Sequence, residues 1–391
     1  MNSGTIKSKL VVILVAANLR AALAAIPPII ILIAQELNLS IMQLSLLTAM
    51  PLVAYAIIPL FYNKIAQTFS MQHTIKLAFL LFSIFSLVRL IGSLETLYIG
   101  TLIMSVSIAL LNVGLPIWIS EIEKSAKAGL VAYYSAAMGF TSSVAIAVAV
   151  PLTILIPGLS WRSALLPWSV LAIVSTIVMW RMVSLKRVPV EKEIVKQSQR
   201  KDYWELFKNA RYRSIILFFA IQSISTFSIG AWLPTILFEK GFSLASSGYL
   251  YAFASAVGAL LGLTFSRRLV TSKFPQRIAI YASCLTMLGL FGTISSSKLV
   301  LYATVMSISI GKFATYALAI HFMVSNTLSI SGKQQLSSAS QVIGYSLAFF
   351  GPIMLGATFE FSNSWNLGLV ILGVLTFTQI YYGSQAAKIR H

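Results

Sequence analysis

Long apolar runs separated by short polar segments follow one another along the whole chain. Each run holds about 18 or more residues, the length that an α-helix needs to cross the hydrocarbon core of a bilayer. The pattern therefore predicts an all-α integral membrane protein with twelve transmembrane helices. The runs lie near residues 9–35, 42–62, 75–93, 96–119, 128–156, 163–184, 213–238, 245–266, 277–296, 298–325, 335–359 and 364–387. Several runs contain prolines, where we expect local kinks, because neighbouring helices can satisfy the freed carbonyls. They are Pro27, Pro28, Pro51, Pro59, Pro116, Pro151, Pro234 and Pro352.

Three short sequence matches relate the first six runs to the last six at nearly one offset. The pairs are Leu39-Ser40 with Phe242-Ser243, Gly139-Phe140 with Gly344-Tyr345, and Trp161 with Trp365. Each pair falls at an equivalent helix boundary or interior, which indicates an internal repeat. We therefore expect two pseudo-symmetric six-helix bundles, at 1–184 and 213–391, joined by a basic linker at 185–212, with a central site at their interface.

Composition and charge fit a membrane protein. Of the 391 residues, 58% are hydrophobic and 10% are charged, against about 25% charged in an ordinary soluble domain. The net charge of +19 would suggest a nucleic-acid partner in a soluble protein, but its distribution argues otherwise. With a cytoplasmic N-terminus, 23 of the 29 basic residues fall on the cytoplasmic side, three outside and three within runs. The positive-inside rule then places both termini of this multi-pass protein in the cytoplasm, in the cell membrane.

The basic linker contains one segment with an amphipathic pattern. Apolar residues alternate with charges over residues 202–212, around Tyr203, Trp204, Leu206 and Phe207. Such a segment can lie as a helix on the inner leaflet. A solvated linker anchored by its basic side chains explains the same pattern.

Two cations lie in the middle of apolar runs, and they are the main candidate site residues. Arg20 is the eleventh of 25 residues in the run 10–34, and Lys312 is the fourteenth of 26 in the run 299–324. A charge at mid-helix costs about 2.5–3.5 kcal/mol on insertion scales, so it normally faces a bundle interior or a wet cavity. The two cations would attract an anion across such a cavity. The alternative is structural, with each side chain bonded to carbonyls of a neighbouring helix. Arg89, nearer the end of its run, is expected to snorkel to the headgroups.

All ten acidic residues lie in loops or at helix ends. A proton relay in a transporter usually carries a carboxylate at mid-membrane. Coupling would here depend on Glu36 or Glu360 at a membrane rim, or on His321, which could equally be a packed histidine. A proton and a counter-ion both remain open as the coupling partner.

Other polar side chains in the same runs are candidates for substrate contact. Amides and hydroxyls in a membrane interior need partners, so each of these residues could instead hold two helices together. The candidates are Asn112, Gln222, Ser223, Tyr316, Gln341 and Tyr345.

Motifs of enzymes and cofactor sites are absent from the sequence. The pairs Gly311-Lys312 and Gly332-Lys333 lack the spacing of a phosphate-binding loop, and the three histidines are scattered. The single cysteine, Cys284, allows neither an internal disulfide nor a cysteine metal cluster. We therefore expect no enzyme activity, no cofactor and no metal site.

Several segments resemble a known family. They include residues 17–23, 63–69, 112–116, 150–152, 161–165, 222–223, 232–234, 241–243, 340–345 and 351–352. In order and spacing they are similar to the cyanate and 2-nitroimidazole transporter family of the major facilitator superfamily. Two departures stand out: the loop after the second helix has no acid and carries Ser70 in place of a glycine, and Lys312 occupies a position where a small residue is expected.

The resemblance implies a monomeric secondary transporter that moves a small anionic or polar organic solute by alternating access. Two alternatives within the superfamily are an exporter of drugs or other amphiphiles, which the many aromatic residues would suit, and a flippase for lipid headgroups. The predicted partners are a small-molecule solute and the lipid bilayer.

Overall fold

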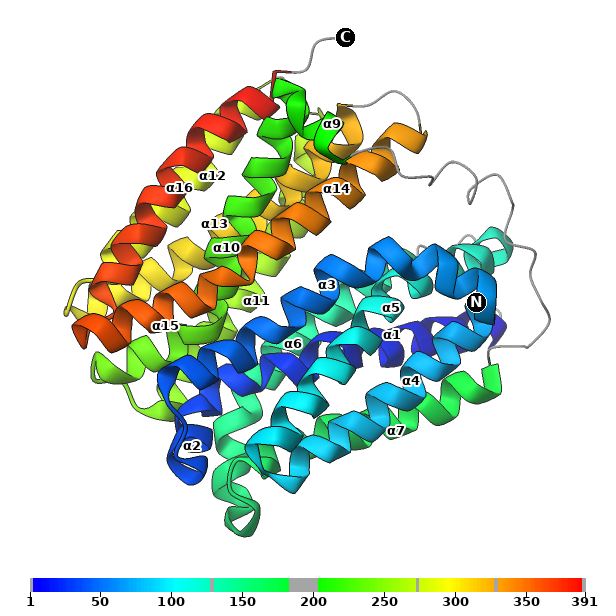
Figure 1. Ribbon diagram of the computed structural model, residues 1–391, viewed down its shortest axis with the longest axis horizontal. Coiled ribbons are helices and arrows are strands. Elements are labelled where there is room, and N and C mark those ends of the chain that lie inside the picture. Colours follow the sequence, from blue (N-terminus) through cyan, green and yellow to red (C-terminus); the bar gives the residue numbers. More distant parts are fainter. Residues whose placement is uncertain (1–2, 127–129, 183–202, 272–273, 327–329, 389–391) are drawn as a thin grey trace. The chain divides into compact units, whose positions relative to one another are not determined.

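The structure is a computed structural model that describes residues 3–126, 130–182, 203–271, 274–326 and 330–388 (Figure 1). Helices account for the regular structure of these residues. In chain order the α-helices are α1 Ser3–Ala24, α2 Ile26–Leu37, α3 Ile41–Phe69, α4 Met71–Val88, α5 Leu94–Ala126, α6 Leu130–Leu155, α7 Arg162–Met182, α9 Tyr203–Lys208, α10 Ala210–Glu239, α11 Leu244–Thr271, α12 Pro275–Gly292, α13 Lys298–Ser325, α14 Ile330–Ala348, α15 Phe350–Ser362 and α16 Asn366–Ala386. Two short 3-10 helices, η1 Arg89–Ile91 and η2 Pro157–Leu159, follow α4 and α6.

The helices confirm the predicted spans. Among the described residues, ten helical stretches are long and apolar enough to cross a membrane, and α1 with α2 makes an eleventh as a bent pair. The twelfth predicted span, near 277–296, corresponds to the less apolar α12. One of the ten stretches, Gln335–Ser362, runs through α14 and α15. The all-α fold with twelve transmembrane segments is therefore as the apolar pattern predicts.

Two prolines bend the first span as expected. The span bends by 43° between α1 and α2, and Ala25 separates the two helices. Pro27 and Pro28 have no N–H, so the carbonyls of Leu23 and Ala24 lose the donors four residues ahead. Other prolines, at 116, 151 and 234, lie inside continuous helices.

The chain divides into two compact units. Unit 1 comprises residues 1–40, 57–188 and 243–252, and unit 2 comprises residues 41–56, 189–242 and 253–391. In this division α3 and α11 each contribute residues to both units. The predicted halves at 1–184 and 213–391 stay a prediction.

Glycines let the helices of unit 2 approach α13 closely. A Cβ on Gly311 of α13 would lie 2.8 Å from the backbone N of Thr286 and 3.0 Å from the carbonyl O of Ala282, both on α12. A Cβ on Gly258 of α11 would similarly meet the backbone of Ser309 and the ring of Phe313. Small residues of this kind allow close backbone contact between membrane helices. The middle of α13, where Lys312 lies, is therefore enclosed by α11 and α12.

The short helix α9 belongs to unit 2 and packs on its core. Its Tyr203, Leu206 and Phe207 pack against the buried core of that unit, and the Tyr203 hydroxyl lies 3.0 Å from the Ser338 hydroxyl of α14. These three apolar residues of the predicted amphipathic segment thus contact protein. The rest of the predicted linker, up to residue 202, lies outside the described residues.

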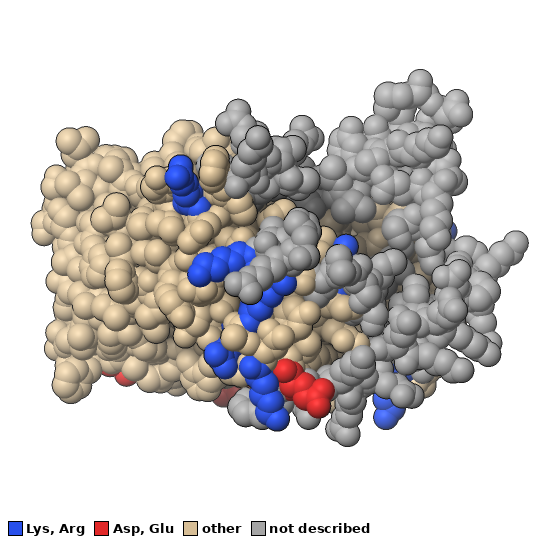
Figure 2. Space-filling model, turned by 90° about the horizontal axis from the view of Figure 1, so that it is seen from above, with Lys and Arg blue, Asp and Glu red and all other residues tan. Residues whose placement is uncertain are grey.

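Most of the described surface on the face shown in Figure 2 is uncharged. The Lys and Arg side chains visible there gather mainly in the central part of this face, and an acidic side chain lies beside them. Large apolar side chains such as Ile57, Phe253, Leu299 and Phe377 are exposed. Exposed apolar side chains of this size suit contact with lipid. The predicted orientation of the termini stays a prediction.

Candidate functional site

Aromatic side chains of unit 2 gather around Tyr345 of α14. The Tyr345 ring lies 5.7 Å from that of Tyr55, 5.5 Å from that of Phe219 and 6.0 Å from that of Phe227, centre to centre, and all three pairs are edge-to-face. The Phe219 ring lies 6.4 Å from that of Tyr316 of α13. We call these five residues the aromatic cluster. Such offset arrangements are the favoured geometry of aromatic pairs.

A polar network on α10 lies between Phe219 and Phe227. The Gln222 amide nitrogen donates to the Thr226 hydroxyl at 2.9 Å and to the Lys312 carbonyl at 3.4 Å, and the Ser223 hydroxyl donates to the Gln222 side-chain oxygen at 3.3 Å. Gln341, one helical turn before Tyr345, donates to Ser337 at 3.1 Å. Five of the predicted residues therefore lie in unit 2: Gln222, Ser223, Tyr316, Gln341 and Tyr345. Tyr316 and Tyr345 both contact Phe219, and Gln222 and Ser223 bond to each other. Tyr55, like Tyr345, can be found from the sequence as a ring with a polar hydroxyl inside an apolar run. Phe219 and Phe227 cannot be told apart from ordinary core residues in this way.

Lys312 lies inside unit 2, with a side chain that is only 7% exposed. Its Nζ is 5.5 Å from the centre of the Phe313 ring. It lines a narrow pocket formed by residues of α10, α12, α13 and α16. The sequence analysis expected Lys312 to face either a wet cavity or a bundle interior. In the structure its neighbours are packed helices of its own unit, α10, α12 and α16.

Arg20 of α1 has an exposed side chain in unit 1, at the middle of the first span. Two residues earlier, Asn18 is fully buried, and its amide nitrogen donates to the Leu171 carbonyl of α7 at 3.0 Å and to the Ser175 hydroxyl. Asn18 therefore holds α1 against α7 and sets the direction in which Arg20 points. Asn112, another predicted contact, is half-buried on α5 of the same unit.

Arg89 is buried, which corrects the expectation that it snorkels to the headgroups. Its side chain is 1% exposed, and Nη1 donates to the Ala22 carbonyl of α1 at 3.1 Å. Ala22 lies in the last turn of α1, so the guanidinium joins the loop end of α4 to the end of α1 near the bend. Its Cγ also fits against Gly100 of α5, where a Cβ would lie 2.5 Å away. Its place four residues before the end of the predicted run does not reveal this, because a long side chain can reach in either direction.

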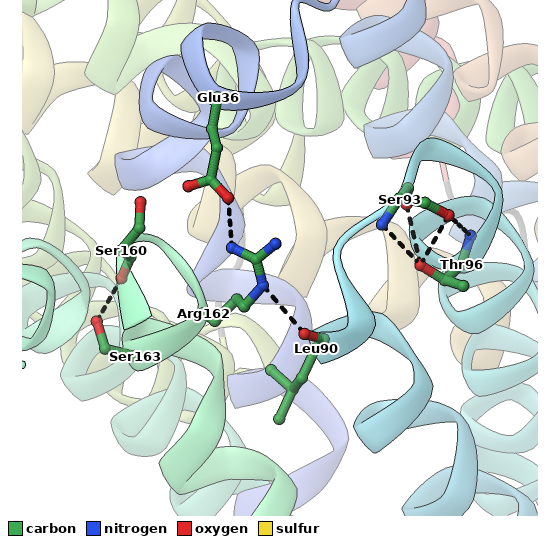
Figure 3. Close-up of polar contacts among 7 residues, drawn as sticks. All are labelled: Glu36, Leu90, Ser93, Thr96, Ser160, Arg162 and Ser163. Atoms are coloured by element: carbon green, nitrogen blue, oxygen red, sulfur yellow. Dashed lines mark hydrogen bonds and ion pairs between the residues drawn. The ribbon is translucent and has the colours of Figure 1, made fainter. Parts of the chain in front are cut away.

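The two predicted coupling acids hold helix ends. In Figure 3 the Glu36 carboxylate of α2 forms an ion pair with Arg162 at the start of α7, and Arg162 Nε donates to the Leu90 carbonyl at 3.1 Å. A Cβ on Gly92, whose φ of +84° is left-handed, would run into this guanidinium. Beside it, Ser93 and Thr96 cap the first turn of α5 by reciprocal hydrogen bonds (Figure 3). In unit 2, a Glu360 side-chain oxygen accepts from the Met42 N–H in the first turn of α3 at 2.9 Å.

His321, the third coupling candidate, is half-buried on α13, with its ring 6.1 Å from that of Phe322. Its backbone carbonyl accepts a hydrogen bond from Ser325 at 2.8 Å. These contacts describe its surroundings and do not test a coupling role.

Unit 2 contains the counterpart of the Arg162 contact. Lys240, just after α10, donates to the Ile294 carbonyl at 2.8 Å, and Ile294 is 204 positions after Leu90. The Trp365 indole donates to Glu239 at 2.8 Å, and Glu239 is 203 positions after Glu36. Equivalent carbonyls thus receive a cation in both units, although from different helices. These contacts agree with the internal repeat read from the sequence.

Comparison with known proteins shows which family and which solved folds the chain resembles. Residues 10–353 match the Major Facilitator Superfamily. The chain is 26% identical to the 2-nitroimidazole transporter of Escherichia coli (strain K12), over 96% of this chain and 94% of that protein. It is 23% identical to the cyanate transport protein CynX of the same organism, over 94% of this chain and 95% of that protein. Among solved structures, a bacterial homologue of the human lysosomal transporter Spinster, inward-facing and occupied, superposes with a TM-score of 0.79 at 13% identity, over 100% of this chain and 98% of that one.

Proposed function

The chain belongs to the Major Facilitator Superfamily and is a multi-pass membrane transporter of a small solute, and from this premise we propose that its cargo is a small planar solute, anionic or polar. It would move by alternating access, as a monomer in the cell membrane with both termini in the cytoplasm. The observation that supports this most is the aromatic cluster of unit 2, next to the amide and hydroxyl groups of α10.

The aromatic cluster suits a planar cargo. Edge and face contacts with Tyr345 and Tyr316 offer a flat solute apolar area and quadrupole interactions, worth about 0.5–1.5 kcal/mol for each aromatic pair. Gln222, Ser223 and Gln341 supply donors and acceptors close to the rings. Specific small-molecule sites combine this kind of apolar lining with a few placed polar groups. The names of the two relatives, a 2-nitroimidazole transporter and a cyanate transport protein, support a small cargo that is either a flat polar heterocycle or a small anion.

Charge makes an anion or a polar molecule the preferred cargo. Arg20 is exposed in the middle of the first span, where a cation is costly unless it faces water, an anion or polar groups. We assign Arg20 and Asn112 to substrate contact in unit 1. Lys312 adds a second positive charge in unit 2 and would disfavour a cationic drug as cargo.

Purified full-length protein in detergent provides the first test, by thermal shift with 2-nitroimidazole and with sodium cyanate. A ligand that binds the folded state alone raises the melting temperature by mass action. We expect the shift to be lost in Arg20→Ala and in Tyr345→Leu. Matched controls are Arg181→Ala and Tyr281→Leu, which change exposed residues of the same types, on α7 and α12.

Three results would contradict the proposal. One is a wild-type protein that responds to neither probe; another is a pair of variants, Arg20→Ala and Tyr345→Leu, that respond as strongly as the wild type. Stabilisation by amphiphilic cations alone would instead support an exporter of amphiphiles.

Coupling is tested in vesicles by replacing Glu36, His321 and Glu360 singly with glutamine. The variant that loses gradient-driven uptake and keeps solute binding identifies the coupling group. Retention of gradient-driven uptake in all three variants would remove these residues from the mechanism.

A further inference from the structure

Two membrane-spanning helices of unit 1, α4 and α7, pack against each other in opposite directions. The Ser169 hydroxyl of α7 donates to the Ser86 carbonyl of α4 at 3.1 Å, and the Thr176 hydroxyl donates to the Phe79 carbonyl at 2.9 Å. The residue number rises on α7 as it falls on α4 along this contact. The start of α4 therefore meets the end of α7 at one surface of the membrane.

Lys76 of α4 carries a positive charge at this meeting point. It is five residues inside the span Met71–Ile91, or about 7.5 Å from the end of the span. Its side chain is 7% exposed, and Nζ lies 5.5 Å from the centre of the ring of Trp180, which is exposed on α7. Trp180 is the second-last residue of the span Arg162–Arg181, a position typical of tryptophans at the membrane–water interface. The Lys76 ammonium thus lies near the depth of the lipid headgroups.

Among the described residues, no carboxylate pairs with Lys76. The sequences of α4 and α7 contain no acid, and the ion pair of unit 1 joins Glu36 to Arg162, at the opposite end of α7. The Trp180 ring attracts the ammonium through its quadrupole but carries no net charge. The positive charge of Lys76 therefore favours an anion at this surface.

An unpartnered amide lies one helical turn before Lys76, on the same face of α4. This amide belongs to Gln72, which is 4% exposed and has no hydrogen-bond partner among the described residues. The unpartnered polar atoms that are fully enclosed in the described protein, such as Nε of Arg89, do not include the tips of Gln72 and Lys76. Both tips therefore reach the surface. We call Gln72, Lys76 and Trp180 the Lys76 site.

The apolar surface below the Lys76 site selects a lipid as the occupant. Leu80 and Ile84 continue the face of Lys76 along α4 towards the middle of the span, and Ile177 lies one turn before Trp180 on α7. All three side chains are exposed, so they suit contact with acyl chains. A free phosphate ion would use the polar tips alone, whereas a phospholipid uses both the polar tips and the apolar surface.

We propose that the Lys76 site binds the headgroup phosphate of an anionic phospholipid. The Lys76 ammonium pairs with a phosphate oxygen, the Gln72 amide donates to another, and Trp180 packs against the glycerol backbone. An anionic headgroup is preferred to a zwitterionic one because its net charge offsets that of Lys76. Basic side chains between membrane helices recognise anionic headgroups in this way, and the predicted orientation places this end of α4 in the cytoplasmic leaflet. The site uses none of the residues that we assign to the transported solute.

The test measures lipid binding to the purified full-length protein in detergent, by native mass spectrometry after bound lipid has been removed. The probes are phosphatidylglycerol, phosphatidylcholine with the same acyl chains, and glycerol 3-phosphate. Wild type should bind phosphatidylglycerol saturably and about tenfold more tightly than phosphatidylcholine, the equivalent of about 1.4 kcal/mol. Glycerol 3-phosphate at the same concentration should not displace the lipid.

Three variants test the residues of the site. Lys76→Met should weaken phosphatidylglycerol binding by about tenfold, to the level of phosphatidylcholine. Lys76→Arg keeps the charge and should retain most of the binding. Gln72→Glu keeps the shape of the side chain but repels phosphate, so it should also weaken binding.

Two control variants separate the site from general effects of charge and fold. Lys298→Met removes an exposed lysine of α13 that also lies beside an aromatic ring, with Nζ 5.6 Å from the centre of the Phe242 ring. Gln276→Leu removes an exposed glutamine of α12. Both should bind phosphatidylglycerol like the wild type. Size-exclusion profiles and helical circular dichroism identify any variant that fails to fold, and the isosteric Gln72→Glu keeps the test decisive if Lys76→Met does so.

Three results would overturn the proposal. One is a wild-type protein that binds phosphatidylglycerol no more tightly than phosphatidylcholine. Another is displacement of the lipid by glycerol 3-phosphate, which would show a site for free phosphate compounds. The third is wild-type binding by the folded Lys76→Met and Gln72→Glu variants. Because the assay contains no transported solute, its outcome is independent of the proposed cargo.

Discussion

A single methyl group on Gly311 should disrupt the contact between α12 and α13. In Gly311→Ala the new Cβ would lie 2.8 Å from the Thr286 backbone N and 3.0 Å from the Ala282 carbonyl O. Ordinary Cβ contacts begin at 3.4 Å, so the α12 backbone has to retreat by about 0.5 Å. Rotation of the Thr286 hydroxyl cannot relieve the contact, because the other two atoms belong to the backbone.

The cost follows from two opposing effects. Overpacking of a well-packed interior costs about 1–3 kcal/mol, and contact with two backbone atoms places this case near the upper end. Alanine in a helix interior regains about 1 kcal/mol over glycine. We expect a net loss of about 2 kcal/mol in the free energy of unfolding, which is about a 30-fold change in the equilibrium.

Equilibrium unfolding in mixed detergent micelles, followed by circular dichroism, measures this change. The matched control is Gly248→Ala on α11, where the nearest atoms to the new Cβ are 3.5 and 3.6 Å away. That variant should be as stable as the wild type or more so. Equal stability of Gly311→Ala and the wild type would refute the close contact that we describe between α12 and α13.

Three further predictions concern contacts within a single unit. Arg162→Ala removes both the ion pair with Glu36 and the bond to the Leu90 carbonyl, so it should lower the melting temperature more than Glu36→Gln does; equal shifts would show that the carbonyl contact contributes nothing. Asn18→Leu leaves α1 without its bonds to α7, and we expect a loss of about 0.6–1.7 kcal/mol in mixed-micelle unfolding, whereas an unchanged midpoint would argue against that role. Trp365→Phe keeps the ring but removes the donor to Glu239, so it should reduce stability by about 1 kcal/mol in the same assay, and a stability equal to the wild type would contradict this.

Hydropathy alone predicts the spans because the length of each apolar run is set by the thickness of the bilayer. The bend at Pro27 and Pro28 is equally predictable, since a missing N–H is a local property of the residue. The internal repeat is visible in short matches such as Trp161 with Trp365. These features depend on residues near one another in sequence or on composition.

The direction in which a side chain points is not predictable in the same way. Arg89 and Lys312 both stand in apolar runs, yet one binds a carbonyl of α1 and the other lines a pocket of its own bundle. Whether such a cation binds a carbonyl or lines a pocket depends on which helices surround it, and the apolar pattern does not identify those helices. Gln379 could have been noticed as an amide inside the last run, but its lack of partners requires the three-dimensional arrangement.

Aromatic candidates show the same limit. Tyr345 is recognisable as a polar-tipped ring within a span, whereas Phe219 and Phe227 look like any other apolar residue of α10. Their edge-to-face contacts with Tyr345 become visible only in the folded unit.

The carbonyls of Leu90 and Ile294 occupy equivalent places in the repeat, but the groups around them respond differently to ionic strength. In unit 1 the cation on the carbonyl also pairs with a carboxylate, Glu36, on a partly exposed rim. In unit 2 the corresponding carboxylate, Glu239, accepts from the neutral indole of Trp365. Salt screens exposed charges that are farther apart than the Debye length, which falls from about 10 Å at 0.1 M to about 3 Å at 1 M, so an exposed ion pair weakens in concentrated salt. A hydrogen bond from a neutral donor is affected less. Concentrated salt should therefore weaken the helix-end contacts of unit 1 before those of unit 2. The two repeats would then differ in how strongly salt destabilises their helix ends.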